Sequence, residues 1–342
     1  MSTITSHELR AQEIQRQLYD LSVVVVSYNT RDILRRCLQH LHECSDGLSL
    51  EILVVDNASR DGSTKMLEQD FPETKVIQSD INLGFAAANN RALRLAHGRY
   101  ILLLNSDAFL RPGALRNAID HMDREPEVGL GGGRLINEDG SWQPSARAFP
   151  SIVNDFLILS GLASHYPRSR FFGRPEWTWA NPMEAANVDW VPGAFAIIRP
   201  EVLAKTGIFD EAFFLYYEEV DLCQRIKALG YKVSYWPDVV VVHLGGESSK
   251  TLPGAVLSCF GSQVTLWSLR SKFLYYRKHH GVSADLVHIL DLCWHRLRAF
   301  RNSLSKTEAH GRKAADSRTV IDLTRRAWTE TDGGRTSPPR PW

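Results

Sequence analysis

Strands and helices alternate over about the first 125 residues, and this alternation constrains the fold more than any other feature of the sequence. Aliphatic runs rich in β-branched residues are typical of strands buried on both faces, and they lie at 21–28, 51–56, 74–78 and 100–105. One-sided helical patterns lie between them at 32–43, 61–70 and 84–97, the last followed by Gly98, a residue that favours helix ends. Such a chain forms a parallel sheet with helices on both faces.

The remainder of the chain is less regular. Residues 129–186 include the glycine run 131–133 and an aromatic segment, which predict one or two short strands and a long ligand-facing loop. Further on, the patterns predict regular structure at 189–199, a helix at 216–229, and strands at 232–235 and 239–243. We divide the chain into a polar leader (1–20), a main domain (21–255, with halves 21–128 and 129–255), a helical extension (256–304) and a disordered tail (305–342).

Composition excludes several classes of protein. The chain carries 40 Lys and Arg against 39 Asp and Glu, so binding of nucleic acid through net positive charge is not expected. Its five cysteines never stand as C-x-x-C pairs, which argues against a zinc site or disulfide framework and favours a reducing, cytoplasmic setting. The polar leader lacks the apolar core of a secretory signal, and no run of 18 apolar residues predicts a membrane span.

Acidic and amide side chains follow the predicted parallel strands, where ligands of such sheets bind. Asp56 ends one strand, and it suits either a base or ribose contact or a helix cap. Asp107 ends another, after Asn105 and Ser106, and it suits either a divalent cation shared with a diphosphate or a cap for the next helix. These positions predict a nucleotide crevice.

A loop of small residues leads into the helix at 84–97. It contains Asn82, Gly84, Asn89 and Asn90 and permits a phosphate to approach a helix N-terminus; tight packing of alanines is the alternative. Neither G-x-G-x-x-G nor G-x-x-x-x-G-K-[ST] occurs, which disfavours dinucleotide oxidoreductases and P-loop hydrolases.

Three acids fall in one helical turn at 218–221. Helix N-termini favour acids, and Asp221 with Arg225 makes an ordinary i,i+4 pair, but adjacent Glu218 and Glu219 would raise one another's pKa and suit general-base work. His243 ends a valine-rich strand and precedes a Gly-Gly loop. At this place it would be a buried core residue, a metal ligand or a phosphate contact.

Seven segments in this order resemble the family 2 glycosyltransferases, and specifically their bacterial rhamnosyltransferase-like branch: SYN, VVDNAS, NLGFAAANN, NSD, WVPGAF, YYEEVDLCQR and VVHLGG. The resemblance covers about residues 21–249. It implies the GT-A fold, a Rossmann-like mixed α/β sheet with helices on both faces. It also implies a nucleotide-diphospho-sugar donor, a divalent metal (Mg²⁺ or Mn²⁺) and inversion at the anomeric carbon.

The resemblance also implies a role for each matching residue. Glu219 matches the base, with Glu218 positioning the sugar or acceptor. Asp107 matches the last acid of the family's D-x-D motif and would hold the metal with His243, while Asn105 replaces the first acid and leaves fewer charges on the ion. The matches for nucleotide-sugar binding are Ser27, Asn29, Asp56, Asn82, Gly84, Asn89, Asn105 and Ser106. Trp190 and Gly193 match the acceptor segment, where Trp190 would stack on a sugar or pack in the core.

We therefore expect an inverting glycosyltransferase that moves rhamnose or a similar sugar, with dTDP-rhamnose favoured, to a glycan or polyprenyl-diphosphate-linked acceptor in cell-surface polysaccharide synthesis. Basic and aromatic residues alternate through 264–301, so this segment would either touch the inner face of the plasma membrane or pack as a helical cap. A nucleotidyltransferase would need a basic, glycine-rich triphosphate loop, which 27–32 lacks. A non-catalytic nucleotide- or glycan-binding module is the other alternative.

Overall fold

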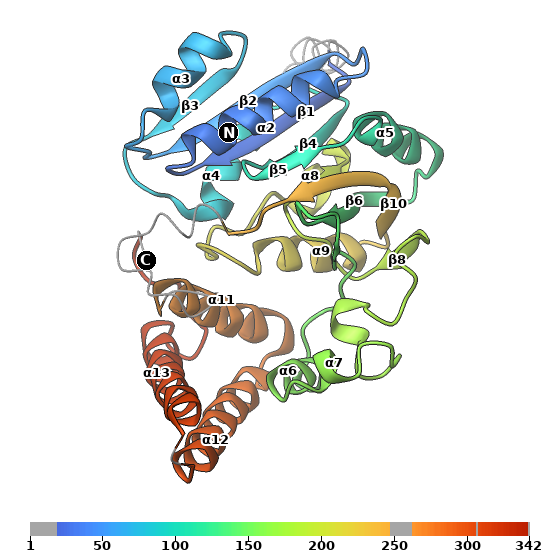
Figure 1. The fold of residues 1–342 in the computed structure, drawn as a ribbon. Helices are drawn as coiled ribbons and strands as arrows, with labels where there is room; N and C mark the ends of the chain where they lie inside the picture. The colour runs from blue at the N-terminus through green and yellow to red at the C-terminus, as the bar shows by residue number, and fades with distance from the viewer. Residues whose placement is uncertain (1–18, 247–261, 306, 341–342) are drawn as a thin grey trace.

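The computed structural model describes residues 19–246, 262–305 and 307–340, and these residues form one ten-stranded sheet above a group of helices (Figure 1). The first half alternates as predicted: β1 (Leu21–Ser27), α2 (Arg31–Glu43), β2 (Leu50–Asn57), α3 (Ser63–Asp70), β3 (Lys75–Ser79), α4 (Gly84–Leu93) and β4 (Tyr100–Asn105). Strands β3, β2, β1 and β4 are adjacent and parallel, with Ser27 opposite Asp56 in the register of β1 and β2. Their carboxyl ends therefore meet at one sheet edge.

The second half extends the same sheet with mixed strand directions. Its elements are β5 (Ala108–Leu110), α5 (Ala114–Arg124), β6 (Val128–Ile136), β7 (Trp142–Gln143), α6 (Ile152–Leu159), α7 (Leu162–His165), η1 (Arg174–Glu176), β8 (Ala186–Val188), β9 (Phe195–Ile198), α8 (Pro200–Thr206), α9 (Glu218–Ala228) and β10 (Lys232–His243). The strand order is β3-β2-β1-β4-β9-β6-β10-β5, and β9 runs antiparallel between β4 and β6. The sheet is thus mixed, as the predicted GT-A architecture requires.

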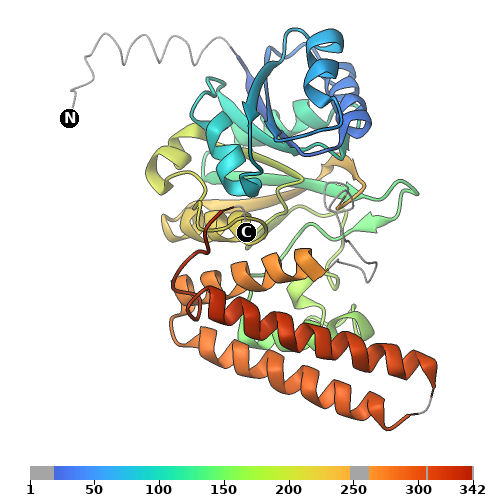
Figure 2. The same cartoon turned by 90° about the vertical axis from the view of Figure 1, so that its left-hand side faces the viewer.

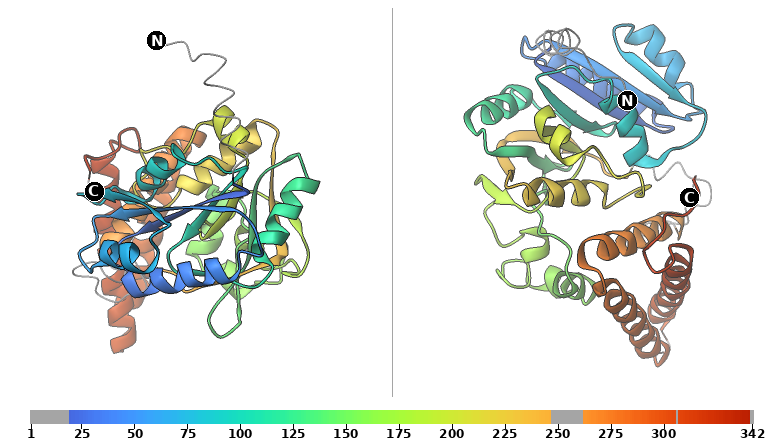
Figure 3. Two further views of the ribbon diagram at one scale, coloured as in Figure 1. Left: turned by 90° about the horizontal axis from the view of Figure 1, so that it is seen from above. Right: turned by 180° about the vertical axis from the view of Figure 1, so that it is seen from behind.

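Helices cover both faces of the sheet (Figure 3). Apolar side chains of α2, α3 and α5 pack in one core, and those of α4, α8 and α9 pack in a second core on the opposite face. Helix α4 approaches the sheet closely because Ala86, Ala88 and Ala92 are fully buried. Residues of β1, β2 and β4 alternate between the two cores, which explains why the central runs 23–26, 52–55 and 101–104 are wholly apolar.

Three predicted boundaries were wrong. The glycine run lies inside the nine-residue strand β6, where a Cβ on Gly131 would lie 1.9 Å from the Trp236 ring, so glycine provides the space for that indole. Helix α4 ends at Leu93, not at His97, and Gly98 instead passes against β1, where a Cβ would lie 2.3 Å from the Ser22 nitrogen. The two strands predicted at 232–243 are one strand, β10, with a register shift between Trp236 and Val240.

The C-terminal part is a three-helix unit below the sheet: α11 (Ser262–His280), α12 (Ser283–Ser303) and α13 (Glu308–Glu330). Figure 2 shows α12 and α13 running side by side as a hairpin. Helix α11 buries Trp267, Phe273 and Tyr275, so it is a packed helix of the domain and not a surface helix. For the first part of 264–301, the packed helical cap is therefore the alternative that holds, and not the membrane contact.

The prediction of a disordered tail from residue 305 was also wrong. Helix α13 packs against α11 and α12, and Trp328 stacks on His288 with ring centroids 4.3 Å apart. Apart from Ile321, its buried face consists of small or hydroxyl-bearing side chains, which a search for apolar periodicity overlooks: Ala314, Ser317, Thr324 and Ala327. Ser317 and Thr324 donate their hydroxyl protons to carbonyls one turn earlier, so they can be buried without an unmet hydrogen bond.

Two further predictions lie largely outside the described residues. Of the polar leader (1–20) only 19–20 are described, and the boundary at 255/256 falls within 247–261. Within the described ranges, no helix combines the length and the apolar character that a membrane span requires.

Candidate active site

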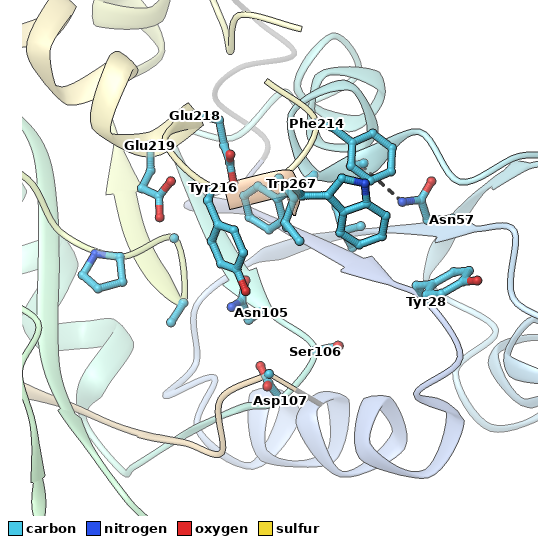
Figure 4. A pocket seen from close by; sticks show the side chains of 18 of the residues that line it. Tyr28, Asn57, Asn105, Ser106, Asp107, Phe214, Tyr216, Glu218, Glu219 and Trp267 are labelled. Atoms are coloured by element: carbon cyan, nitrogen blue, oxygen red, sulfur yellow. Dashed lines mark hydrogen bonds between the residues drawn. The ribbon is translucent and has the colours of Figure 1, made fainter. Parts of the chain in front are cut away.

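A cavity of about 270 Å³ lies at the carboxyl ends of β1, β2 and β4 (Figure 4). Its walls come from the two halves of the sheet domain, from the start of α9 and from α11. Nine of the predicted site residues line it: Asn82, Gly84, Asn105, Ser106, Asp107, Gly193, Glu218, Glu219 and His243. The sheet topology therefore brings together residues that lie up to 161 positions apart, from Asn82 to His243.

Asn57 organises one side of the cavity. Its side-chain amide donates to Asn82 Oδ1 at 2.9 Å and to the Gly84 carbonyl at 3.2 Å, and its oxygen accepts from the Leu83 nitrogen at 2.8 Å. Gly84 has a φ of +77°, and a Cβ there would lie 2.2 Å from the Phe214 carbonyl oxygen. The glycine is required by both backbone conformation and space.

The residues that end β1 and β2 lie just behind this wall. Ser27 is fully buried and its hydroxyl lies 3.0 Å from that of Thr30. Asn29 accepts from the Arg60 nitrogen at 2.7 Å. Asp56 accepts from the Ser59 nitrogen at 3.2 Å through one oxygen, and its buried Oδ1 has no hydrogen bond among the described residues. Asp56 therefore keeps one acceptor for a ligand, while Ser27 and Asn29 shape the loop.

Asn89 and Trp190 do not line this cavity. Asn89 is buried within α4, and its amide donates to the Phe85 carbonyl at 2.9 Å, so it stabilises the helix and does not reach a nucleotide. The indole nitrogen of Trp190 donates to the Ala148 carbonyl at 3.0 Å, and its ring packs partly in the core. For Asn89 the structure contradicts the predicted contact.

Asp107 and His243 stand together on the opposite side of the cavity from the glutamates. Strand β10 pairs antiparallel with β5 and sets His243 opposite Ala108, so that Nε2 lies 3.4 Å from Asp107 Oδ1. His243 Nδ1 lies 2.7 Å from Gln143 Oε1, which can only accept. Nδ1 therefore donates to Gln143 Oε1, and Nε2 faces the Asp107 carboxylate.

This pair fits a divalent cation in part. Nε2 is buried without a hydrogen bond among the described residues. Gln143 orients the ring through Nδ1, as side chains that hydrogen-bond to metal-binding histidines do. Within the described ranges no three side chains of the His, Cys, Asp and Glu types form a closed metal site. A cation here would take two protein ligands and complete its shell with phosphate oxygens and water, as Mg²⁺ commonly does.

Helix α9 begins with the acidic pair. Tyr216 and Tyr217 precede it with φ values of 69° and 68°, a conformation that side chains of this size rarely adopt. This sharp entry aims Glu218 and Glu219 into the cavity, as Figure 4 shows. One carboxylate oxygen of each is buried without a hydrogen bond among the described residues, so both remain available to a ligand.

Burial raises the pKa of both glutamates. For Glu218 the cause is desolvation, reinforced by the neighbouring Glu219 charge, and its pKa lies well above the ordinary value. Desolvation raises the pKa of Glu219 to about 7, although the Arg147 charge and backbone N–H groups, including that of Gly193, pull it down. A carboxylate that titrates near neutral pH is suited to accept a proton from a hydroxyl group.

The third acid of the turn has a structural role. Asp221 is fully buried and forms ion pairs with Arg225 at 2.9 Å, Lys278 at 2.6 Å and His279 at 2.7 Å. Burial acts to raise its pKa, but these partners outweigh burial and lower it to about 2. Asp221 therefore ties α9 to α11, and of the three acids only the two glutamates line the cavity.

A second cavity of about 210 Å³ lies on the far side of Glu219. Glu219 and Tyr216 line both cavities, so they form the boundary between them. Arg147 and Trp190 also line the second cavity, with the guanidinium carbon 5.6 Å from the indole ring centre. Trp190 thus lines the second cavity and not the first.

Sequence reasoning missed several aromatic side chains of the first cavity. Tyr28 follows β1, while Phe214 and Trp267 pack with ring centroids 4.9 Å apart on the side of α9 and α11 (Figure 4). Trp267 could not be assigned, because only the packing of α11 brings this C-terminal residue to the sheet edge. Asn57 stood beside Asp56 in the motif, and its place at the strand end was the available signal.

Comparison with known proteins agrees with this geometry. The model of the family "Glycosyl transferase family 2" matches residues 22–187. An N-acetylglucosaminyl-diphospho-decaprenol L-rhamnosyltransferase of Mycobacterium tuberculosis is 30% identical over 254 residues, which cover 70% of this chain and 80% of the relative. This chain belongs to glycosyl transferase family 2. The predicted family and its rhamnosyltransferase branch are thereby confirmed.

Further relatives of this family 2 glycosyltransferase support the same assignment. The rhamnosyltransferase WbbL of Escherichia coli is 24% identical over 273 residues, 76% of this chain and 94% of WbbL. Among solved structures, the mannosyltransferase PcManGT of Pyrobaculum calidifontis, which was solved with GDP-mannose and Mn²⁺, covers 93% of this chain with a TM-score of 0.52 at 16% identity; the match covers 94% of that protein. This likeness establishes the fold, and the enzyme class follows from the family.

Proposed function

We propose that this family 2 glycosyltransferase transfers L-rhamnose from dTDP-rhamnose, with inversion, to a lipid-linked glycan in cell-surface polysaccharide synthesis at the inner face of the membrane. The position of Glu219 carries the proposal, because this carboxylate stands between two cavities and faces the Asp107 side of the first one. The Mycobacterium tuberculosis relative is named for transfer of L-rhamnose to a diphospho-decaprenol lipid, which supports the choice of sugar and acceptor.

The donor would occupy the first cavity. Its nucleotide would lie against the wall that Asn57, Asn82 and Gly84 build, with Asp56 Oδ1 as an acceptor behind it. The aromatic groups on the α9 and α11 side would close the cavity over the sugar and exclude water. Asp107 and the other polar groups at the end of β4 would then lie beside the diphosphate.

Asp107 and His243 would hold a divalent cation on the diphosphate. When bound, such a cation neutralises the charge that develops on the leaving phosphate. Both ligand atoms are already close together without a cation, because the hydrogen bond to Gln143 orients the imidazole ring so that Nε2 faces Asp107. Asn105 adds no charge, so the site carries a single carboxylate and depends on the donor for its remaining ligands.

The acceptor hydroxyl would approach from the second cavity, past Trp190. Glu219 would accept its proton as the hydroxyl oxygen attacks the anomeric carbon from the face opposite the diphosphate, which inverts the configuration. An ionised Glu219 fits this task at neutral pH, because its pKa is about 7. Burial and the neighbouring Glu219 charge raise the pKa of Glu218 well above its ordinary value, which favours its protonated form, and this form would donate a hydrogen bond that positions the sugar.

A donor panel tests the proposal. Isothermal calorimetry with dTDP-, UDP- and GDP-sugars, with and without Mn²⁺ or Mg²⁺, should give metal-assisted binding of dTDP-rhamnose and weaker binding of the others. Asp107→Ala should weaken metal and donor binding together. Glu219→Gln should retain donor binding while transfer to a polyprenyl-diphosphate-linked acceptor falls by about 10² to 10⁴-fold.

Three outcomes would contradict the proposal. Preference for a UDP- or GDP-sugar would refute the donor assignment while leaving the base in place. Wild-type turnover in Glu219→Gln would refute the base assignment. Failure of every nucleotide-sugar to bind would favour a non-catalytic module instead.

A further inference from the structure

An apolar stripe runs along the outside of α12. Its members recur every three or four residues and are Val282, Leu286, Ile289, Cys293, Leu297, Phe300 and Leu304. At 3.6 residues per turn they fall within an arc of roughly 80°. The six large apolar side chains among them are exposed by between 51% (Leu297) and 76% (Val282). Soluble surfaces seldom leave so long an apolar row uncovered.

The exposed charges on α12 are mostly positive. Arg296, Arg298 and Arg301 are exposed. Of the two acids on this helix, Asp291 is buried and bound to Lys272 at 2.9 Å, and the half-exposed Asp285 in the first turn is paired with Arg277 at 2.9 Å. From Leu286 onward the helix therefore exposes apolar and cationic side chains without an acidic one.

Helix α6 widens the stripe into a face. Phe156 on α6 and Trp294 on α12 pack edge to face with ring centroids 6.2 Å apart. Val153, Phe156 and Ile158 are all exposed on the α6 surface. Figure 1 shows the two helices adjacent at the end of the molecule opposite the sheet. We call this combined surface of α6 and α12 the apolar ledge.

The apolar ledge adjoins the acceptor side of the active site. Ile158 lies about 160° around α6 from Phe156, is exposed by 55% and lines the second cavity, at whose other side Glu219 lies. Asn154 and Asp155, on the inner side of α6, line the same cavity. Helix α6 thus separates the ledge from the polar space that reaches the base.

We propose that the apolar ledge seats the enzyme on the surface of an anionic phospholipid bilayer, with α12 lying in the interface. Its apolar row would enter the boundary between headgroups and acyl chains, while the arginines would pair with lipid phosphates. A bilayer fits better than a protein partner because the row is long and narrow, its one half-exposed acid, Asp285, is already paired with Arg277, and its arginines are exposed. One part of the inference rests on the proposed function: a lipid-linked acceptor would enter the second cavity beside Ile158.

Vesicle binding tests the ledge without any substrate. The full-length protein should co-sediment with vesicles of phosphatidylglycerol and phosphatidylcholine more strongly than with phosphatidylcholine alone, and binding should weaken with salt. The double variant Leu297→Ser/Phe300→Ser should lower the partition coefficient by about tenfold or more. Replacing Arg296 or Arg301 with Gln should lower it by about fivefold each on the anionic vesicles.

The chain offers a matched control. Leu229 at the end of α9 is exposed by 51%, the same fraction as Leu297, but lies away from the ledge, so Leu229→Ser should not change binding. A polarity-sensitive fluorophore on Cys293, in a Cys259→Ser background, should report an apolar surrounding when vesicles are added. Unchanged melting temperatures would exclude unfolding as the cause of lost binding.

Three results would overturn the inference. They are absence of wild-type binding to anionic vesicles, equal binding by the ledge variant and wild type, and a wild-type dimer that the ledge variant converts to monomer without any lipid. The last would assign the ledge to a second copy of the chain. Donor binding measured by calorimetry is independent of the ledge, so failure here is distinguishable from failure of the proposed function.

Discussion

The pH dependence of transfer provides the sharpest quantitative test of the proposed base. Glu219 must be ionised to accept a proton, and desolvation raises its pKa to about 7. With that pKa, about 9% of the free enzyme has an ionised Glu219 at pH 6 and about 91% at pH 8. We therefore expect kcat/KM to increase about tenfold over this interval. In a plot of log(kcat/KM) against pH, the slope of this rising limb should approach one at low pH.

The same contacts predict how the limb moves. Arg147 lowers the pKa of Glu219 through its charge, so Arg147→Gln should shift the limb to higher pH. Glu219→Gln should remove the limb together with most of the activity. The assay is initial-rate kinetics with subsaturating donor and acceptor between pH 5.5 and 9, with donor affinity measured at each pH as the control. A profile that stays flat from pH 6 to 8 in the wild type would refute the reasoning.

Three further predictions concern the fold around the site. The Lys272 ammonium lies 3.0 Å from Asp155 and 2.9 Å from Asp291, so Lys272→Met would leave these two carboxylates buried without their shared cation. The free energy of unfolding measured in urea should fall by about 3–5 kcal/mol, and a loss below about 1 kcal/mol would contradict this prediction. Glu218→Gln should raise that free energy at pH 8 by at least about 1 kcal/mol, because the fold penalises the ionised carboxylate more than the unfolded chain does; unchanged or lower stability would count against it. Gly84→Ala should weaken donor binding in calorimetry because a Cβ would meet the Phe214 carbonyl at 2.2 Å, and wild-type affinity would show that the loop relaxes freely.

The sign of the Glu218 prediction follows from linkage. Its pKa is raised in the fold, so between the ordinary pKa and the raised one the native state binds more protons than the unfolded state. Stability therefore falls as pH rises through this interval. The glutamine variant has no such proton to lose, and its advantage over the wild type should shrink toward pH 5.

Much of the sheet could be predicted because its strands are buried on both faces. The central runs of β1, β2 and β4, at 23–26, 52–55 and 101–104, contain no polar residue that would suggest an exposed face, and glycine or helix patterns separate them. The error at Gly131 has a physical cause that no local pattern contains, since the space it provides is filled by Trp236 from β10. The tail was predicted to be disordered because Ser317 and Thr324 do not look like core residues. Their hydroxyls donate to backbone carbonyls one turn earlier in α13, which allows both side chains to be buried.

The site could be predicted where it depends on strand ends, and not where it depends on packing between distant helices. Asp107 immediately precedes β5 and His243 ends β10, and the antiparallel pairing of these two strands brings the two residues together. Asn89 was assigned from a motif that the chain shares with its family, but its place on α4 turns the amide toward the Phe85 carbonyl. Trp267 reaches the cavity only through the packing of α11, which sequence periodicity does not specify.

The helical extension is a structural part of the active site. The entry to α9 holds Tyr216 and Tyr217 at positive φ, which costs about 1–3 kcal/mol for each residue. Such a conformation persists only where the surroundings fix it, and here Lys278 and His279 of α11 bind the buried Asp221 one turn further along α9. The strain and the buried carboxylates at the start of α9 are therefore offset by ion pairs to the extension. It follows that α11 holds Glu218 and Glu219 in position, while α12, on the opposite side of the same helical unit, presents the ledge.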